Sequence, residues 1–400
     1  MDTRISLGCE LSGKRLFIPT EQLRRPTCLY GLDGVGKSTA MAHLALHDVR
    51  QGHTVVVLDA RGKLVNRLLN AIPAEQADRA IYLNPGNASW MPVWNPLLVN
   101  AEAERGRVID AIVGALLFQF PTRGDREQYL LRVGLSAAMH LPGGCLADVL
   151  DLLHPTSTKG ARIRSRALEA LNDGWAKRFF KDGFGKYSSF ELEPVRRLVA
   201  RLVSSMPARR FFYQRDSLLR LEEVVGNRGI LLVDLSSLPS AARADLGRMM
   251  YHLLVCEIPH GEDAIPNGAP PVRVYWDRTD YMAPELEFDR ETISGRRVSV
   301  TWACRELVAE NRSRDDMLRC LDTAIVFRVA ATTARLLQKA LLGFVRSEEL
   351  VRMADGQAAV LSGKKVALIR TDPFPIGSSS NVRDAVICRS RDQLCRRIGS

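Results

Sequence analysis

Hydrophobic residues follow two different patterns along the chain, and the change between them suggests how it is organised. Residues 28–100 alternate short apolar runs with helical stretches, and the run Thr54–Leu58 is typical of a strand buried on both faces of a parallel sheet. Between 101 and 218 the apolar residues recur with the helical period, and strand signals almost disappear. The alternation returns at Gly229. The pattern therefore predicts an α/β fold with a mainly parallel sheet, interrupted by an inserted all-α domain.

The same pattern predicts the individual elements and domains. Strands are expected at 16–18, 27–30, 54–58, 80–83, 230–233, 272–276, 298–302 and 324–329, and a final hairpin turns at Ser362-Gly363. Helices are expected at 38–51, 63–70, 108–118, 126–139, 146–153, 162–171, 193–203, 241–257 and 332–342. The expected domains are a β-rich lead-in at 1–27, the α/β domain at 28–100 and 219–370, the all-α insertion at 101–218, and a basic C-terminal tail at 371–400.

Composition and charge narrow the class of protein. The 400 residues are 46% hydrophobic and 25% charged, as in a globular protein. The 56 basic residues exceed the 45 acidic ones and give a net charge of +11. This excess suits a polyanionic partner. Most of the basic residues are arginine, which suits phosphate binding, although codon bias explains the preference for arginine over lysine equally well.

Several kinds of protein are disfavoured by what the sequence lacks. No apolar stretch approaches the roughly 18 residues of a membrane helix, and the eight cysteines include no C-x-x-C pair. We therefore expect a cytoplasmic protein with no integral membrane segment, leader or disulfide scaffold. The motifs H-E-x-x-H and G-x-S-x-G are also absent, which disfavours metalloprotease and α/β-hydrolase chemistry.

The strongest chemical signal is a glycine-rich segment between an expected strand and an expected helix. It reads GLDGVGKS and matches the phosphate-binding loop motif G-x-x-x-x-G-K-[ST]. In such a loop the backbone N–H groups surround the β-phosphate, Lys37 reaches the β- and γ-phosphates, Ser38 offers its hydroxyl to Mg²⁺, and Thr39 meets the α-phosphate. The motif predicts ATP and Mg²⁺ as cofactors. The residues predicted to bind the nucleotide are Gly31, Gly34, Val35, Gly36, Lys37, Ser38 and Thr39.

A P-loop ATPase also needs an aspartate at the end of an apolar strand, and usually a glutamate beside it to orient the attacking water. Asp59, Asp234 and Asp277 each end such a strand, and none is followed by Glu. Either the base lies elsewhere, with Asp280 or Glu306 as candidates, or hydrolysis is slow or missing.

The order of these motifs resembles the HerA and TraG/TraD-type conjugative coupling ATPases, within the FtsK-like DNA translocases. The segments TVVVLDARGKLVNRLL, AIYLNPGNASWMPVWNPL, GILLVDLSSL and VYWDRTDYMAP are similar to successive family motifs over most of the chain. The resemblance implies a RecA-like P-loop domain in which Asp277 binds the metal, with Asp234 as the runner-up. It also implies that Arg328, in VFRVA, faces the nucleotide of a neighbouring subunit.

The departures from the family concern catalysis. Arg278 stands where the family has its catalytic Glu, and Arg305 stands where it has a Gln sensor. The acidic DPHGD loop has become Asp59-Ala-Arg-Gly-Lys63, and a family Asn is Asp322. A cation cannot take a proton from water at neutral pH, so these exchanges count against turnover unless the alignment is shifted and Asp280 is the base.

Two functions follow from the resemblance. The first is an ATP-binding, DNA-translocating ATPase of conjugative transfer or genome maintenance that forms a homo-hexameric ring. The alternative is a hydrolysis-deficient nucleotide-binding subunit of a DNA-handling complex. DNA would be held by sequence-independent phosphate contacts, and secretion or DNA-processing proteins are possible partners. The candidate DNA contacts are Arg162, Arg164, Arg166, Arg196, Arg197, Arg201, Arg209, Arg210, Arg389, Arg391, Arg396 and Arg397.

Overall fold

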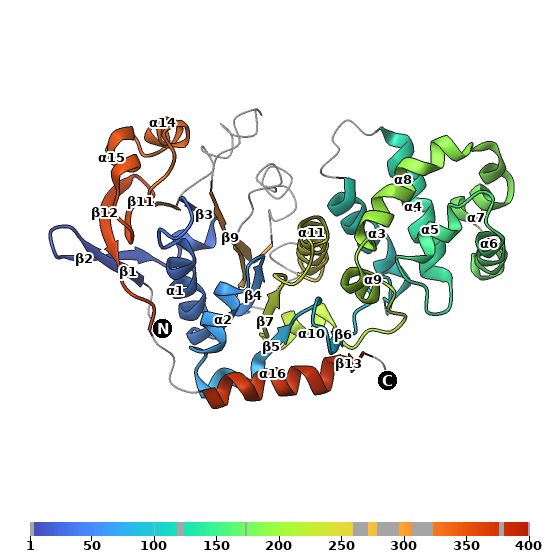
Figure 1. Ribbon diagram of the computed structural model, residues 1–400, viewed down its shortest axis with the longest axis horizontal. Helices are drawn as coiled ribbons and strands as arrows, with labels where there is room; N and C mark the ends of the chain where they lie inside the picture. The colour runs from blue at the N-terminus through green and yellow to red at the C-terminus, as the bar shows by residue number, and fades with distance from the viewer. Residues whose placement is uncertain are drawn as a thin grey trace. The chain divides into compact units, whose positions relative to one another are not determined.

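An eleven-stranded sheet carries the candidate site in this computed structural model (Figure 1). The structure describes residues 4–99, 101–117, 124–172, 174–258, 271–277, 296–305, 323–375 and 380–398. In spatial order the strands are β2 (Arg15–Pro19), β1 (Arg4–Glu10), β12 (Lys365–Thr371), β11 (Gln357–Ser362), β10 (Thr323–Val326), β3 (Thr27–Tyr30), β9 (Val298–Cys304), β8 (Val272–Asp277), β4 (Thr54–Asp59), β7 (Ile230–Asp234) and β5 (Ala80–Leu83).

The seven strands from β10 to β5 are parallel, and the four from β2 to β11 are joined by antiparallel pairing. The central strands β3, β4, β7, β8 and β9 are buried at every residue. This explains their continuous apolar runs, because a parallel sheet is covered on both faces. Parallel strands also end at the same edge, so the residues that follow them meet there.

Helices α1 (Lys37–Arg50) and α2 (Lys63–Leu69) pack on the central strands (Figure 1). Their apolar residues, including Met41 and Leu68, join the main core of the sheet. Among the described residues, the sheet is also accompanied by η1 (Gln22–Arg24), η2 (Ala74–Arg79), α10 (Leu221–Gly226), α14 (Ala331–Ala340), α15 (Ser347–Arg352) and most of α16 (Ser380–Leu394).

A buried polar network ties the far end of α1 to β8. Asp48, near the end of α1, accepts a hydrogen bond from the Tyr275 hydroxyl at 2.5 Å and lies 3.6 Å from Nε of Arg273. His53 Nδ1 bonds to the same carboxylate at 3.0 Å. Arg273, Tyr275 and Asp277 are spaced two residues apart and therefore lie on the same face of β8. The helix that carries the glycine-rich loop is therefore bonded to the strand that carries Asp277.

The chain divides into two compact units. The sheet unit comprises Met1–Leu83, Glu222–Leu235 and Ile258–Ser390, and the helical unit comprises Asn84–Leu221, Ser236–Glu257 and Arg391–Ser400. The helical unit contains α3 (Glu102–Leu117), α4 (Asp125–His140), α5 (Asp148–Leu152), α6 (Thr158–Ala170), α7 (Trp175–Arg178), the π-helical turn η3 (Phe179–Gly183), η4 (Phe184–Lys186), α8 (Ser189–Leu202), α9 (Met206–Phe212), α11 (Ser240–Cys256) and the strand pair β6 (Trp90–Pro92) and β13 (Cys395–Arg397).

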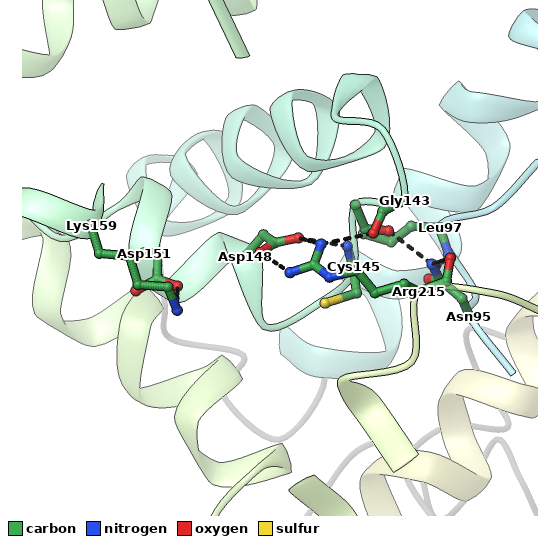
Figure 2. Close-up of polar contacts among 9 residues, drawn as sticks. Asn95, Leu97, Gly143, Cys145, Asp148, Asp151, Lys159 and Arg215 are labelled. Carbon is green, nitrogen blue, oxygen red and sulfur yellow. Dashed lines mark hydrogen bonds and ion pairs between the residues drawn. The ribbon is translucent and has the colours of Figure 1, made fainter. Parts of the chain in front are cut away.

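The Asn-Pro-Leu motif of the sequence lies inside the helical unit, where it organises a polar junction (Figure 2). The buried Asn95 amide donates to the Gly144 carbonyl at 2.8 Å, and its oxygen accepts from Leu97 N at 3.0 Å. Beside it, Arg215 makes a two-pronged ion pair with the buried Asp148, at 2.7 and 2.9 Å. The motif thus joins the start of the helical unit to the loops before α5 and after α9.

The C-terminal residues, expected to form a basic tail, contain a helix. Residues 380–394 form α16, whose Val382, Val386 and Ile387 pack against the sheet core. Arg389 is bound to Asp78 and to the carbonyls of Ala77 and Ala80. The apolar residues of α16 are spaced to lie on one face, and this amphipathic pattern is outweighed in the sequence by the many arginines.

Candidate nucleotide-binding site

The glycine-rich loop joins the end of β3 to the start of α1. Gly34 and Gly36 have φ angles of 84° and 121°, which side chains disfavour. A Cβ on Gly31 would lie 2.8 Å from the Cβ of Phe327, and one on Gly36 would lie 3.0 Å from its ring. Val35 is fully buried beneath the loop. The glycines are therefore required both by the backbone turn and by close packing on Phe327.

Three side chains at the start of α1 have defined partners. Lys37 Nζ donates to the carbonyls of Gly31 and Leu32, the latter at 2.8 Å, so the lysine folds back over the loop. Ser38 Oγ donates to Asp277 Oδ2 at 2.7 Å. The Thr39 hydroxyl accepts a hydrogen bond from the guanidinium of Arg67 on α2.

The three strand-end aspartates lie side by side, because β4 pairs in register with both neighbours. Asp59 is aligned with Asp234 on β7 and with Asp277 on β8. Asp277 contacts the glycine-rich loop through Ser38, whereas Asp234 accepts a bond from the Tyr82 hydroxyl at 3.3 Å. Asp277 is thus the strand-end carboxylate that the structure brings to Ser38.

The third carboxylate, Asp59, accepts hydrogen bonds from the backbone that follows it. One oxygen accepts from Arg61 N at 2.9 Å, and the other accepts from Val65 N at 3.0 Å. Burial, and next the negative charge of Asp277, raise the pKa of Asp59 to about 7, against the opposing effect of the bond from Val65 N. Asp59 therefore fixes the backbone that leads from β4 into α2.

The hydroxyl of Ser38 and the carboxylate of Asp277 provide oxygen ligands, which Mg²⁺ prefers. The two groups are 2.7 Å apart, at the end of the glycine-rich loop where α1 begins. The donor set therefore fits a magnesium ion bound together with nucleotide phosphates.

The pocket around this loop is lined mainly by polar and charged side chains. Besides the loop residues and Asp277, it is lined by Arg61, Lys63, Arg67 and Arg305. Arg61 also pairs with Asp33 of the loop at 3.0 Å. The sequence marked Arg61, Lys63 and Arg305 as departures from family motifs but did not single out Arg67, which looks like an ordinary helix-surface arginine. The expected residues Arg278, Asp280, Glu306 and Asp322 lie outside the described residues.

Arg328, predicted to act on a neighbouring subunit, is not among the residues that line this pocket. Its guanidinium pairs with Asp355 at 2.8 Å and donates to the Met353 carbonyl at 3.2 Å. Its backbone carbonyl accepts from Leu32 N at 2.8 Å and so supports the glycine-rich loop.

Most of the candidate DNA-binding arginines make contacts within the chain. Arg164 donates to the carbonyls of Leu152 and His154 and lies over the Phe184 ring. By contrast, Arg162 and Arg166 are exposed and lie four residues apart on α6, so they share one helix face. The other paired arginines are Arg196 and Arg197 with Glu193, Arg201 with Asp245, Arg391 with Asp392, and Arg396 with Asp216.

Comparisons with known proteins agree with this description. Residues 13–127 match a family model described as the type IV secretion-system coupling protein DNA-binding domain. The unbound conjugative coupling protein TrwB (TrwBdeltaN70) is 14% identical, with a TM-score of 0.64 over 95% of this chain and 91% of its own. VirB4 of Thermoanaerobacter pseudethanolicus is 12% identical, with a TM-score of 0.58 over 94% of this chain and 98% of its own. No curated protein sequence matches significantly.

The fold and the site are those of a P-loop NTPase fold with a mainly parallel sheet and an inserted, mainly helical unit, which confirms the predicted fold class. The family-model match at residues 13–127 confirms the resemblance to conjugative coupling proteins over that segment, and the structural likeness to TrwB confirms the fold. None of the helices in the described part of the chain is both long and apolar enough to span a membrane.

Proposed function

We propose that this protein binds Mg²⁺–ATP at Gly31–Thr39 and acts on DNA as an ATPase of the conjugative coupling kind. The observation that carries the proposal is the Ser38–Asp277 contact at the mouth of a glycine-rich loop. A likeness to TrwB solved with ADP and Mg²⁺, at a TM-score of 0.61 and 14% identity over 94% of this chain and 90% of that one, supports the same ligands.

Each residue of the site has a defined task in this proposal. The loop N–H groups bind the β-phosphate, and Lys37 leaves its two carbonyl partners to bind the β- and γ-phosphates. Ser38 and Asp277 hold the magnesium ion, which neutralises charge on the phosphate oxygens when bound. Thr39, which accepts a hydrogen bond from Arg67, would contact the α-phosphate.

DNA is the proposed macromolecular partner. The family model that matches residues 13–127 is described as a DNA-binding domain, and the net charge is +11. The exposed pair Arg162 and Arg166 on α6 is suited to phosphate contacts that do not depend on sequence. We further propose a homo-hexameric ring in the cytoplasm, in which Arg328 exchanges Asp355 for the nucleotide of a neighbouring subunit, together with secretion or DNA-processing partners.

A second function is favoured by one observation. Arg305 lines the pocket where the resembling family has a neutral glutamine sensor, and the carboxylates among the described lining residues are Asp33 and Asp277 only. A pocket with this lining binds nucleotide but lacks a described general base. The second candidate is therefore a nucleotide-binding, hydrolysis-deficient subunit of a DNA-handling complex.

Steady-state ATP hydrolysis, measured with and without double-stranded DNA, separates the two functions. The ATPase proposal predicts turnover that DNA stimulates and that Lys37→Ala abolishes. Binding of ATP without turnover under either condition supports the second function and overturns the first. Turnover that persists in the Lys37→Ala protein would mean that a contaminating enzyme or another site is responsible.

A further inference from the structure

The pocket beside the glycine-rich loop has an unusual balance of charge. Four cations from outside the loop line it, namely Arg61, Lys63, Arg67 and Arg305. With Lys37 this makes five cationic side chains, against the two carboxylates of Asp33 and Asp277. The lining is therefore suited to a ligand that carries several negative charges.

The sheet topology places two of these arginines on opposite sides of Asp277. Strand β8 lies between β9 and β4, and Asp277 is aligned with Ala303 on one side and Asp59 on the other. Arg305 follows Ala303 by two residues, and Arg61 follows Asp59 by two residues. Phosphates bound next to Ser38 and Asp277 would thus have an arginine from each neighbouring strand end.

The loop that carries Arg61 and Lys63 is held in place by hydrogen bonds within the protein. Asp59 accepts hydrogen bonds from the backbone N–H groups of Arg61 and Val65. The Arg61 side chain rests on Asp33 at 3.0 Å, but the two side chains are 38% and 44% exposed. An exposed ion pair of this kind contributes little stability, so Arg61 can exchange Asp33 for a phosphate at low cost.

We propose that Arg61, Lys63 and Arg305, with Arg67 beside Thr39, form a second set of phosphate ligands supplied by the same chain. The ligand class is a nucleoside 5′-triphosphate. Its terminal phosphate is the group that Arg61, Lys63 and Arg305 recognise, and Arg67 lies on the α-phosphate side with Thr39. This inference rests on the proposed function, because it assigns further phosphate ligands to the same nucleotide site.

Two consequences distinguish this site from an ordinary glycine-rich loop. Guanidinium groups stay charged at all physiological pH values and bind phosphate through two parallel N–H bonds. The pocket should therefore bind ATP at least about tenfold more tightly than ADP, since charge-assisted contacts of this strength correspond to a tenfold or larger change in affinity. The cations also neutralise the phosphates, so much of this preference should persist without Mg²⁺.

The test measures ATP and ADP affinities of the full chain by isothermal titration calorimetry, once with Mg²⁺ and once with EDTA. The variants are Arg305→Gln and the double substitution Arg61→Gln with Lys63→Gln, which change exposed side chains. The matched control is Arg24→Gln, an exposed arginine of the same unit that does not line the pocket. The wild type and the control should prefer ATP in both buffers, and both pocket variants should lose most of that preference in EDTA.

The outcomes separate this inference from the proposed function. If the wild type binds ATP in a Lys37-dependent way but the pocket variants keep the wild-type preference for ATP over ADP, the proposed second set of phosphate ligands is wrong. The nucleotide site at the glycine-rich loop would still stand. Loss of all wild-type ATP binding in EDTA also overturns the inference. If the wild type binds neither nucleotide with Mg²⁺, the proposed function itself fails.

Discussion

Asp48 is expected to hold the glycine-rich loop and Asp277 in their relative positions. It lies near the C-terminal end of α1, whereas the loop precedes the N-terminal end of that helix. Its side chain is 6% exposed and faces Arg273, Tyr275 and His53. The substitution Asp48→Asn keeps the shape and one oxygen acceptor but removes the negative charge. The buried Arg273, 3% exposed, would then keep only its neutral partners, the Leu23 carbonyl and the Ser299 hydroxyl.

The expected cost comes from two interactions. Unit charges 3.6 Å apart attract by about 4–5 kcal/mol at an effective dielectric constant near 20, and part of this is offset because Asn is cheaper to bury than Asp. The hydrogen bond from Tyr275 also weakens when its acceptor is neutral. We therefore expect the local opening free energy of α1 and β8 to fall by about 3 kcal/mol, within the range for breaking a buried ion pair.

Hydrogen exchange followed by mass spectrometry measures this directly. Peptides from α1 and β8 should exchange about a hundredfold faster in Asp48→Asn, since 1.4 kcal/mol corresponds to about a factor of ten. Peptides from α3 and α4 in the helical unit should not change, and the control Asp78→Asn, at a fully exposed carboxylate paired with Arg389, should match the wild type. Exchange within about threefold of the wild type in both α1 and β8 would refute the reasoning.

The effect of Asp48→Asn should also depend on pH. Burial alone raises the pKa of Asp48, but the bond from His53, the charge of Arg273 and the bond from Tyr275 together hold it below its ordinary value. A lowered carboxyl pKa contributes stability above the unfolded-state pKa, and that stability is lost as pH falls through the folded-state pKa. The difference between wild type and variant should therefore shrink on acidification below pH 4.

Two further predictions concern the other charged pairs. Arg215→Ala leaves the buried Asp148 without its counter-charge and should destabilise the helical unit by about 2–3 kcal/mol, a small loss for a broken buried pair because Arg215 is half exposed. Hydrogen exchange of α5 measures this loss, with Arg132→Ala, which breaks the more exposed pair with Asp110, as the control. Equal protection of α5 in the two variants would contradict the prediction. Asp277→Asn should lose less stability than the wild type as the pH rises from 5 to 8. The reason is that the raised pKa of Asp59, about 7, contributes stability that is full below pH 3.8 and lost as pH rises through 7, and the variant removes the neighbouring charge that adds to this shift. Melting curves at both pH values test this, and parallel curves would contradict it.

Local features of the sequence were sufficient to predict most of the sheet and the glycine-rich loop. The motif GLDGVGKS and the apolar runs around it are short contiguous stretches of sequence, so they can be recognised without knowledge of the fold. The expected strands at 27–30 and 80–83 coincide with β3 and β5. The helix expected at 38–51 begins one residue earlier, at Lys37, because Gly36 ends the loop.

Contacts between distant segments could not be predicted in the same way. The three strand-end aspartates were equivalent candidates by local pattern, and the family resemblance alone favoured Asp277. The order of strands explains why Asp277 lies next to Ser38. Arg67 gave no signal, since its contact with Thr39 depends on how α2 packs beside α1. Two of the three partners of Asp48, Arg273 and Tyr275, are more than two hundred residues away in the sequence.

The central claim is that Gly31–Thr39 binds the triphosphate of ATP, and equilibrium titration of ATP with Mg²⁺ tests it most directly. The wild type should bind one ATP per chain, and Lys37→Ala should reduce the affinity by at least about a hundredfold, because the lysine provides charge-assisted contacts to two phosphates. Circular dichroism should show the variant to be folded. Equal ATP affinity in the wild type and the folded Lys37→Ala protein would contradict the account.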